Sequence, residues 1–124
     1  MALPRIDHIQ LAAPPGCEDE ARAFYGGLLG LAEVPKPPTL AARGGAWFMV
    51  GAQALHIGVE KDFRPARKAH PALACSAIDE LAARLEGAGA PVRWDEELPG
   101  VRRFYTADPF GNRIEIIASP EETA

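Results

Sequence analysis

The stretch Tyr105–Ile117, YTADPFGNRIEII, predicts a β-hairpin, because strand-forming residues flank a segment rich in turn formers. Its central DPFGN segment contains the proline, glycine and asparagine that favour tight turns. We therefore expect strands over residues 101–107 and 113–118. Glu115 lies between two isoleucines in the second strand, so strand alternation places its carboxylate on the face opposite them.

The first half of the chain contains a matching hairpin. Residues 46–50 and 54–60 predict two strands, and Gly51-Ala52-Gln53 predicts the turn between them. His56 lies between two apolar residues in the second of these strands, and it precedes Glu115 by 59 positions. The two residues thus occupy matching points of the two hairpins.

Each hairpin follows a predicted strand, helix and second strand. In the first half these elements are expected over residues 6–12, 18–29 and 31–35, and in the second half over 70–75, 78–86 and 92–95, with Ser76 as the helix N-cap. The sequence therefore predicts an α+β fold of two βαβββ modules, about 5–60 and 69–118, related by internal duplication. Together they form one domain over residues 1–124, whose mixed sheets curl around a cup.

Composition restricts the class of protein. The 124 residues are 48% hydrophobic and 24% charged, as in ordinary globular domains, and the net charge of −4 argues against nucleic acid or an anionic membrane as a partner. No apolar run is long enough for a membrane span, and the N-terminus lacks a signal-peptide pattern, so we expect a cytoplasmic protein. Cys17 and Cys75 form no disulfide framework, and neither receives a catalytic role. The acidic segment 95–97 is expected to face solvent.

The three histidines of the chain, together with Glu115, form a candidate metal site. His8 and His70 lie near the starts of the first strands of the two modules, and His56 and Glu115 lie in the last strands. These four side chains can meet at one point if the modules share a cup. Three imidazoles and a carboxylate suit Zn, Ni, Co, Fe or Mn rather than Ca or Mg. The alternative is that each is a hydrogen-bonded structural residue.

Five further residues are candidates for binding a small-molecule substrate. Arg64 and Arg67, in the segment between the modules, could close over an anionic group, although such a run is more often a solvated connector. Trp47 and Phe104 could line an apolar cup, or they could pack in the core. Gln10 shares the polar face of its strand with His8.

Three segments together resemble the vicinal oxygen chelate superfamily, which includes glyoxalase I, fosfomycin-resistance proteins, bleomycin-resistance proteins and extradiol dioxygenases. The segments are Ile6–Ile9 (IDHI), Ala23–Leu31 (AFYGGLLGL) and Tyr105–Ile117. The resemblance covers about residues 5–118. It implies the paired βαβββ fold and a homodimer with two cups, each lined by both subunits.

In metal-dependent members of the superfamily, the ligands come from the first and last strands of each module. Carried over by position, the resemblance implies His8, His56, His70 and Glu115 as ligands. Glyoxalase I has a carboxylate at the position of His56, and the fosfomycin enzymes use a triad that His8, His70 and Glu115 satisfy. The fosfomycin enzymes carry a hydroxyl residue where this chain has Gln10. Bleomycin-resistance proteins lack the metal ligands.

The resemblance implies an enzyme that chelates two vicinal oxygens of a small molecule through one divalent transition metal per site. Glu115 or a metal-bound water would carry the proton, and the reaction would be that of a lyase, an isomerase or a dioxygenase. The alternative is a small-molecule binding protein of the bleomycin-resistance type, which performs no chemistry. Such a binder would tolerate loss of the ligand residues.

Overall fold

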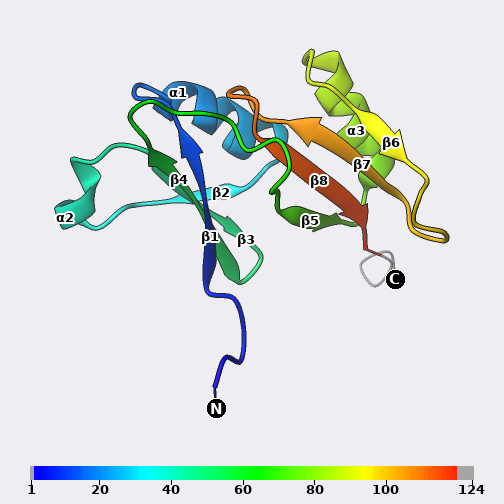
Figure 1. Ribbon diagram of the computed structural model, residues 1–124, viewed down its shortest axis with the longest axis horizontal. Coiled ribbons are helices and arrows are strands. Elements are labelled where there is room, and N and C mark those ends of the chain that lie inside the picture. Colours follow the sequence, from blue (N-terminus) through cyan, green and yellow to red (C-terminus); the bar gives the residue numbers. More distant parts are fainter. Residues whose placement is uncertain (1, 120–124) are drawn as a thin grey trace. The chain divides into compact units, whose positions relative to one another are not determined.

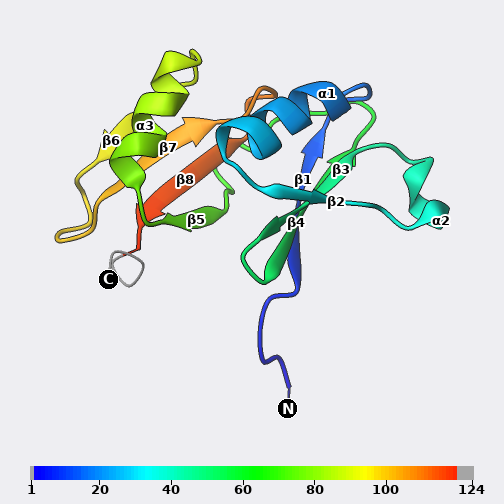
Figure 2. The same ribbon diagram turned by 180° about the vertical axis from the view of Figure 1, so that it is seen from behind.

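The computed structural model describes residues 2–119, which divide after Pro65 into two compact units. Each unit consists of one four-stranded mixed sheet with a helical segment on one face (Figure 1). Figure 2 shows the same elements from behind. No helix among the described residues is both long and apolar enough to cross a membrane.

The first unit has the strand order β1-β4-β3-β2. β1 runs parallel to β4, and β3 is antiparallel to both of its neighbours. The elements, in chain order, are β1 (His8–Ala13), α1 (Glu18–Ala21), the π-helix η1 (Arg22–Leu28), β2 (Ala32–Val34), α2 (Pro38–Ala41), β3 (Ala46–Val50) and β4 (Gln53–Val59).

The second unit repeats this topology with the strand order β5-β8-β7-β6. β5 is parallel to β8, and β7 is antiparallel to both of its neighbours. The elements are β5 (Ala72–Cys75), α3 (Ile78–Gly87), β6 (Arg93–Asp95), β7 (Arg103–Ala107) and β8 (Arg113–Ala118). Both βαβββ modules and the α+β fold class are therefore confirmed.

The first helix differs from the expectation for residues 18–29. It begins as an α-helix and widens into the π-helix η1, where the Leu29 amide donates to the Phe24 carbonyl five residues earlier at 2.9 Å. The wider turn lets the consecutive aromatic residues Phe24 and Tyr25 both face the core, where they are 3% and 0% exposed. Gly30, at φ +73°, ends the helical segment.

Two smaller expectations were wrong, and one short helix was not expected. The cap position of α3 is Ala77 rather than Ser76, and no side chain caps this helix. β5 begins at Ala72, so His70 precedes the strand, although the Glu115 amide still bonds the Pro71 carbonyl at 3.0 Å. The short helix α2 was not expected, and it begins at a proline, a residue that suits the first helical turn.

Strand alternation places the core of each unit on the helix-facing side of its sheet. In β4, Leu55 and Ile57 are 2% and 1% exposed, and in β8, Ile114 and Ile116 are 0% and 1% exposed. The residue between each pair therefore faces the other side of the sheet. These residues are His56 and Glu115, two of the four metal ligands that the sequence predicts.

Candidate functional site

A histidine pair and a tryptophan occupy the open face of the first sheet; we call His8 and His56 the first half-site. His56 on β4 lies between β1 and β3, and its ring stacks on Trp47 with a centroid distance of 3.9 Å and an interplanar angle of 3°. On its other side the His8 ring stacks at 4.3 Å and 21°. The stack leaves His56 only 8% exposed, although it lies on the face away from the helix.

Asp7 orients the His8 ring. The Nδ1 atom of His8 lies 3.0 Å from Oδ1 of Asp7, and this hydrogen bond holds the pKa of the Asp7 carboxyl below its usual value. An ionised carboxylate only accepts hydrogen bonds, so Nδ1 of His8 carries the proton. Nε2 of His8 is then free to bind a metal ion, an arrangement common in metal-binding histidines.

Burial lowers the pKa of His56, and the neighbouring charge of His8 lowers it further. A buried imidazole avoids a charge that would lose its hydration. His56 is therefore neutral near pH 7, which is the form that binds metal ions.

The lowered pKa of His56 predicts a pH-dependent stability in the metal-free protein. Unfolded histidine binds a proton near pH 6.5, whereas folded His56 binds one only at lower pH, so acid favours the unfolded state. Below about pH 6.5, the free energy of unfolding should fall more steeply in the wild type than in His56→Gln. Urea unfolding with a chelator between pH 5 and 8 measures both slopes, which should coincide above pH 7.5. Equal slopes below pH 6.5 would contradict the assignment.

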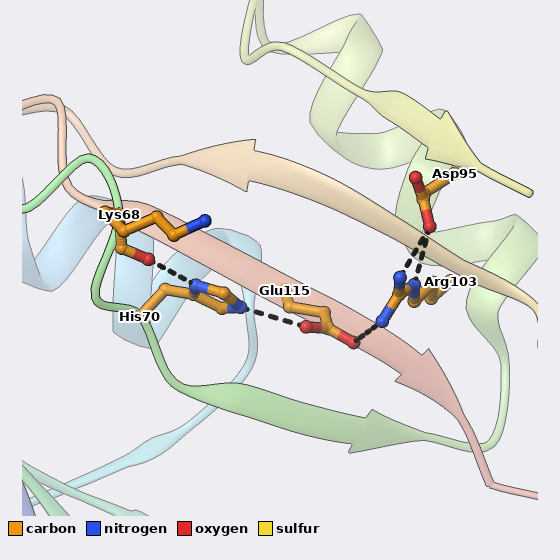
Figure 3. Close-up of polar contacts among 5 residues, drawn as sticks. All are labelled: Lys68, His70, Asp95, Arg103 and Glu115. Atoms are coloured by element: carbon orange, nitrogen blue, oxygen red, sulfur yellow. Dashed lines mark hydrogen bonds and ion pairs between the residues drawn. The ribbon is translucent and has the colours of Figure 1, made fainter. Parts of the chain in front are cut away.

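His70 and Glu115 face each other on the second unit, and we call them the second half-site (Figure 3). The Nε2 atom of His70 lies 3.0 Å from Oε1 of Glu115, and Nδ1 of His70 lies 2.8 Å from the Lys68 carbonyl oxygen. A carbonyl only accepts, so Nδ1 carries a proton, and Nε2 either carries a second proton that it donates to the carboxylate or presents a lone pair. At 3.0 Å, Nε2 of His70 and Oε1 of Glu115 share a proton or, once that proton is lost, can bind the same metal ion. The second half-site thus fits a cation.

Arg103 fixes the other carboxylate oxygen of Glu115. Its Nη1 lies 3.4 Å from Oε2 of Glu115, and its Nε and Nη2 donate to Oδ2 of Asp95 at 2.8 and 2.6 Å. All three side chains are less than one-fifth exposed. Asp95, the last residue of β6, therefore pairs with Arg103 on β7, and the expectation that the whole segment 95–97 faces solvent was wrong at Asp95.

The remaining candidates lie in three different environments. Gln10 is opposite His56 in the β1–β4 register and lies on the same face, where its amide packs over Gly58 so closely that a Cβ there would lie 2.7 Å from Nε2. Arg64 and Arg67 are exposed in the segment between the units. Phe104 is 0% exposed on the helix-facing side of its sheet, where it packs against Trp94, so it is a core residue rather than a cup-lining one.

Sequence reasoning did not assign roles to Asp7, Asp95, Arg103 or the Lys68 carbonyl. Asp7 is adjacent to His8 in sequence and could have been found as its partner. The contact between Arg103 and Glu115 depends on the β7–β8 register, in which Arg103 is opposite Ile117 and so lies diagonally from Glu115. No local sequence pattern specifies that register.

The candidate ligands divide evenly between the units. His8 and His56 belong to the first unit, and His70 and Glu115 belong to the second. Within neither unit, over residues 2–119, do three or more potential ligand side chains form a cluster. Each unit thus contains two of the four candidate ligands.

Comparisons with known proteins give a consistent result. The family model described as "Glyoxalase-like domain" matches residues 17–117. A Bacillus anthracis crystal structure assigned to the glyoxalase family is 52% identical, with a TM-score of 0.92, covering 96% of this chain and 98% of that one. Lactoylglutathione lyase from Agrobacterium tumefaciens is 22% identical, with a TM-score of 0.76 and 96% coverage of both chains. No curated protein matches this chain.

A third structure is similar in fold alone. It is a variant of a fosfomycin resistance protein from Listeria monocytogenes, complexed with Mn(II) and 1S,2S-dihydroxypropylphosphonic acid. It is 17% identical to this chain, with a TM-score of 0.80 and 98% coverage of both chains.

Proposed function

The chain belongs to the glyoxalase-like domain family, and from that premise we propose that it is a metal-dependent enzyme of the vicinal oxygen chelate superfamily. Its substrate would be a small molecule with two neighbouring oxygen atoms, and its reaction would be that of a lyase, an isomerase or a dioxygenase. The observation that carries the proposal is the second half-site. There, Nε2 of His70 and Oε1 of Glu115 lie 3.0 Å apart on the open face of the second sheet.

We propose His8, His56, His70 and Glu115 as the residues that hold the metal. Hydrogen bonds from Nδ1 leave Nε2 of His8 and of His70 as the donor atoms, and burial keeps His56 neutral. Three imidazoles and one carboxylate suit Zn, Ni, Co, Fe or Mn, and the similar fosfomycin resistance protein was crystallised with Mn(II). When bound, such an ion would act as a Lewis acid on the substrate oxygens.

We propose that Glu115 also moves the proton in the reaction. Arg103 holds one oxygen of this carboxylate, so the other oxygen keeps a fixed direction toward His70. A buried carboxylate of fixed orientation loses little freedom when it takes a proton from a bound substrate. Trp47 and Gln10 share the open face of the first sheet with its histidines and are proposed to contact the substrate.

We also propose a homodimer in which each site combines the first half-site of one subunit with the second half-site of the other. The support is that each unit contains only two of the four proposed ligands. A metal ion of this class needs at least three protein ligands for a stable site. A second copy of the chain can supply the missing pair.

The experiment that tests the proposed function is elemental analysis of protein purified without a His-tag or chelator. We expect about one equivalent of a transition metal per chain, lost in Glu115→Ala, because the proposed site would lose its only carboxylate and one of its four protein ligands. A matched control is Glu60→Ala, which removes an exposed carboxylate beyond the end of β4 and should retain the metal. A metal-free wild type after growth with all five metals would contradict the enzyme and favour the small-molecule binding protein.

A further inference from the structure

Three arginine side chains surround the ring of Tyr105 on the second unit. The Cζ atoms of Arg93, Arg103 and Arg113 lie 5.5, 5.7 and 4.9 Å from the ring centroid. They come from the three neighbouring strands β6, β7 and β8. Arg93 is directly opposite Tyr105 in the β6–β7 register. The strands thus bring three cations together on the face of the sheet that also holds Glu115.

Only one of these three cations is balanced by carboxylates. Arg103 pairs with Asp95 and Glu115. Within residues 66–119, no carboxylate lies within 4.0 Å of the guanidinium group of Arg93 or Arg113, and the Tyr105 ring is their recorded side-chain partner. Like charges held together repel, and the repulsion is relieved when an anion binds between them. Arg93 and Arg113 can therefore bind an anion that balances their charge.

Within residues 66–119, neither Arg93 nor Arg113 makes a side-chain hydrogen bond, so the N–H groups of these two arginines are available to a ligand. The attraction between a guanidinium and an aromatic ring does not consume the N–H groups, which lie in the guanidinium plane. Two such groups can each offer a planar fork to an oxyanion such as carboxylate or phosphonate. Lysines could supply the charge but not this shape.

The cluster adjoins the second half-site. Tyr105 is directly opposite Glu115 in the β7–β8 register, and its ring meets the His70 ring edge-on at a centroid distance of 5.5 Å. An anion bound by Arg93 and Arg113 would thus be separated from His70 by a single aromatic ring. A small molecule can span that separation.

We propose that Arg93 and Arg113 form a binding site for an oxyanionic group, a carboxylate or a phosphonate, of the molecule that reacts at the half-sites. The assignment of this anion to the substrate rests on the proposed function, whereas the anion site itself rests on the second unit alone. Arg103 is occupied by its carboxylates and has a positioning role. The substrate is then a small anion with two neighbouring oxygen atoms close to its charged end.

The test is an NMR titration of the full-length protein with methylphosphonate and, separately, with acetate, at constant ionic strength. We expect saturable shifts of the arginine Nε–H signals of Arg93 and Arg113. The double variant Arg93→Gln/Arg113→Gln should weaken binding at least about tenfold, because charge-assisted hydrogen bonds are lost. The control Arg43→Gln/Arg84→Gln removes the same charge from exposed positions elsewhere and should bind as the wild type does.

Further outcomes separate this inference from the proposed function. Arg93→Lys/Arg113→Lys keeps the charge but loses the planar fork, and an intermediate affinity is expected. No saturable shift, or equal weakening in the control variant, would overturn the anion site. Metal content is measured on the same samples. Bound metal without anion binding overturns this inference alone, and anion binding in a protein that takes up no metal overturns the proposed function alone.

Discussion

Replacement of Asp108 by alanine is expected to lower the free energy of unfolding by about 3–5 kcal/mol, because several buried donors lose their acceptor. The Asp108 carboxylate is 4% exposed and accepts hydrogen bonds from the Phe110 amide at 3.0 Å and from the Asn112 amide at 2.9 Å. Its second oxygen accepts from Nδ2 of Asn112 at 2.9 Å. Such a loss is a large part of the stability of an ordinary domain.

Urea unfolding of Asp108→Ala, Asp108→Asn and Asp19→Ala measures this effect. Asp108→Asn should give an intermediate loss, since one amide oxygen remains while its NH₂ group opposes that of Asn112. Asp19 is fully exposed on α1, so its removal should change stability by about 0.5 kcal/mol or less. A loss below about 1 kcal/mol in Asp108→Ala would mean that water replaces the carboxylate without cost.

The Asp108 turn also positions the second half-site. Oδ1 of Asn112 accepts a hydrogen bond from the Ala66 amide at 2.9 Å, and the Ala66 carbonyl accepts one from the Arg113 amide at 2.9 Å. The segment that leads to His70 is therefore fixed to the turn that begins β8. A variant that opens the turn should release the contact between His70 and Glu115 as well as lowering stability.

The sequence was sufficient to predict which faces of the strands hold the candidate ligands. Strand alternation has a period of two, so an apolar residue on each side of His56 or Glu115 already determines the direction of its side chain. The similar spacing of the two modules was sufficient to predict the duplication. Both predictions depend only on neighbouring residues or on counting along the chain.

Contacts across strands were beyond sequence reasoning. Arg103 reaches Asp95 and Glu115 because three strands pair in one register, and a shift of one residue would turn Arg103 to the other face. For the same reason, the sequence could not decide which face of β7 holds Phe104. Arg103 and Tyr105 lie on the face of Glu115, so Phe104 between them lies on the other face, but this follows only once the pairing of β7 with β8 is known. The π-helix was missed because helical periodicity does not reveal a wider turn.

Mixed dimers of two defective chains are expected to recover a metal site that neither chain can form alone. In the proposed homodimer, His8→Ala damages only the first half-site and Glu115→Ala damages only the second. A dimer of a His8→Ala chain with a Glu115→Ala chain contains two different sites. One site combines both damaged half-sites, and the other combines both intact half-sites. Co-expression with two different tags and purification through both should therefore yield about half of the wild-type metal per chain.

A reciprocal pairing makes this experiment decisive. A dimer of the wild type with His8→Ala/Glu115→Ala should bind almost no metal, because each shared site then contains one damaged half. If each site instead lay within one chain, the results would be reversed: the first pairing would bind no metal, and the second would bind half. A single species of about 13 kDa by sedimentation, the mass of one chain, would contradict the shared site directly. The two pairings have the same overall number of substitutions, so a difference between them reports only how the half-sites combine.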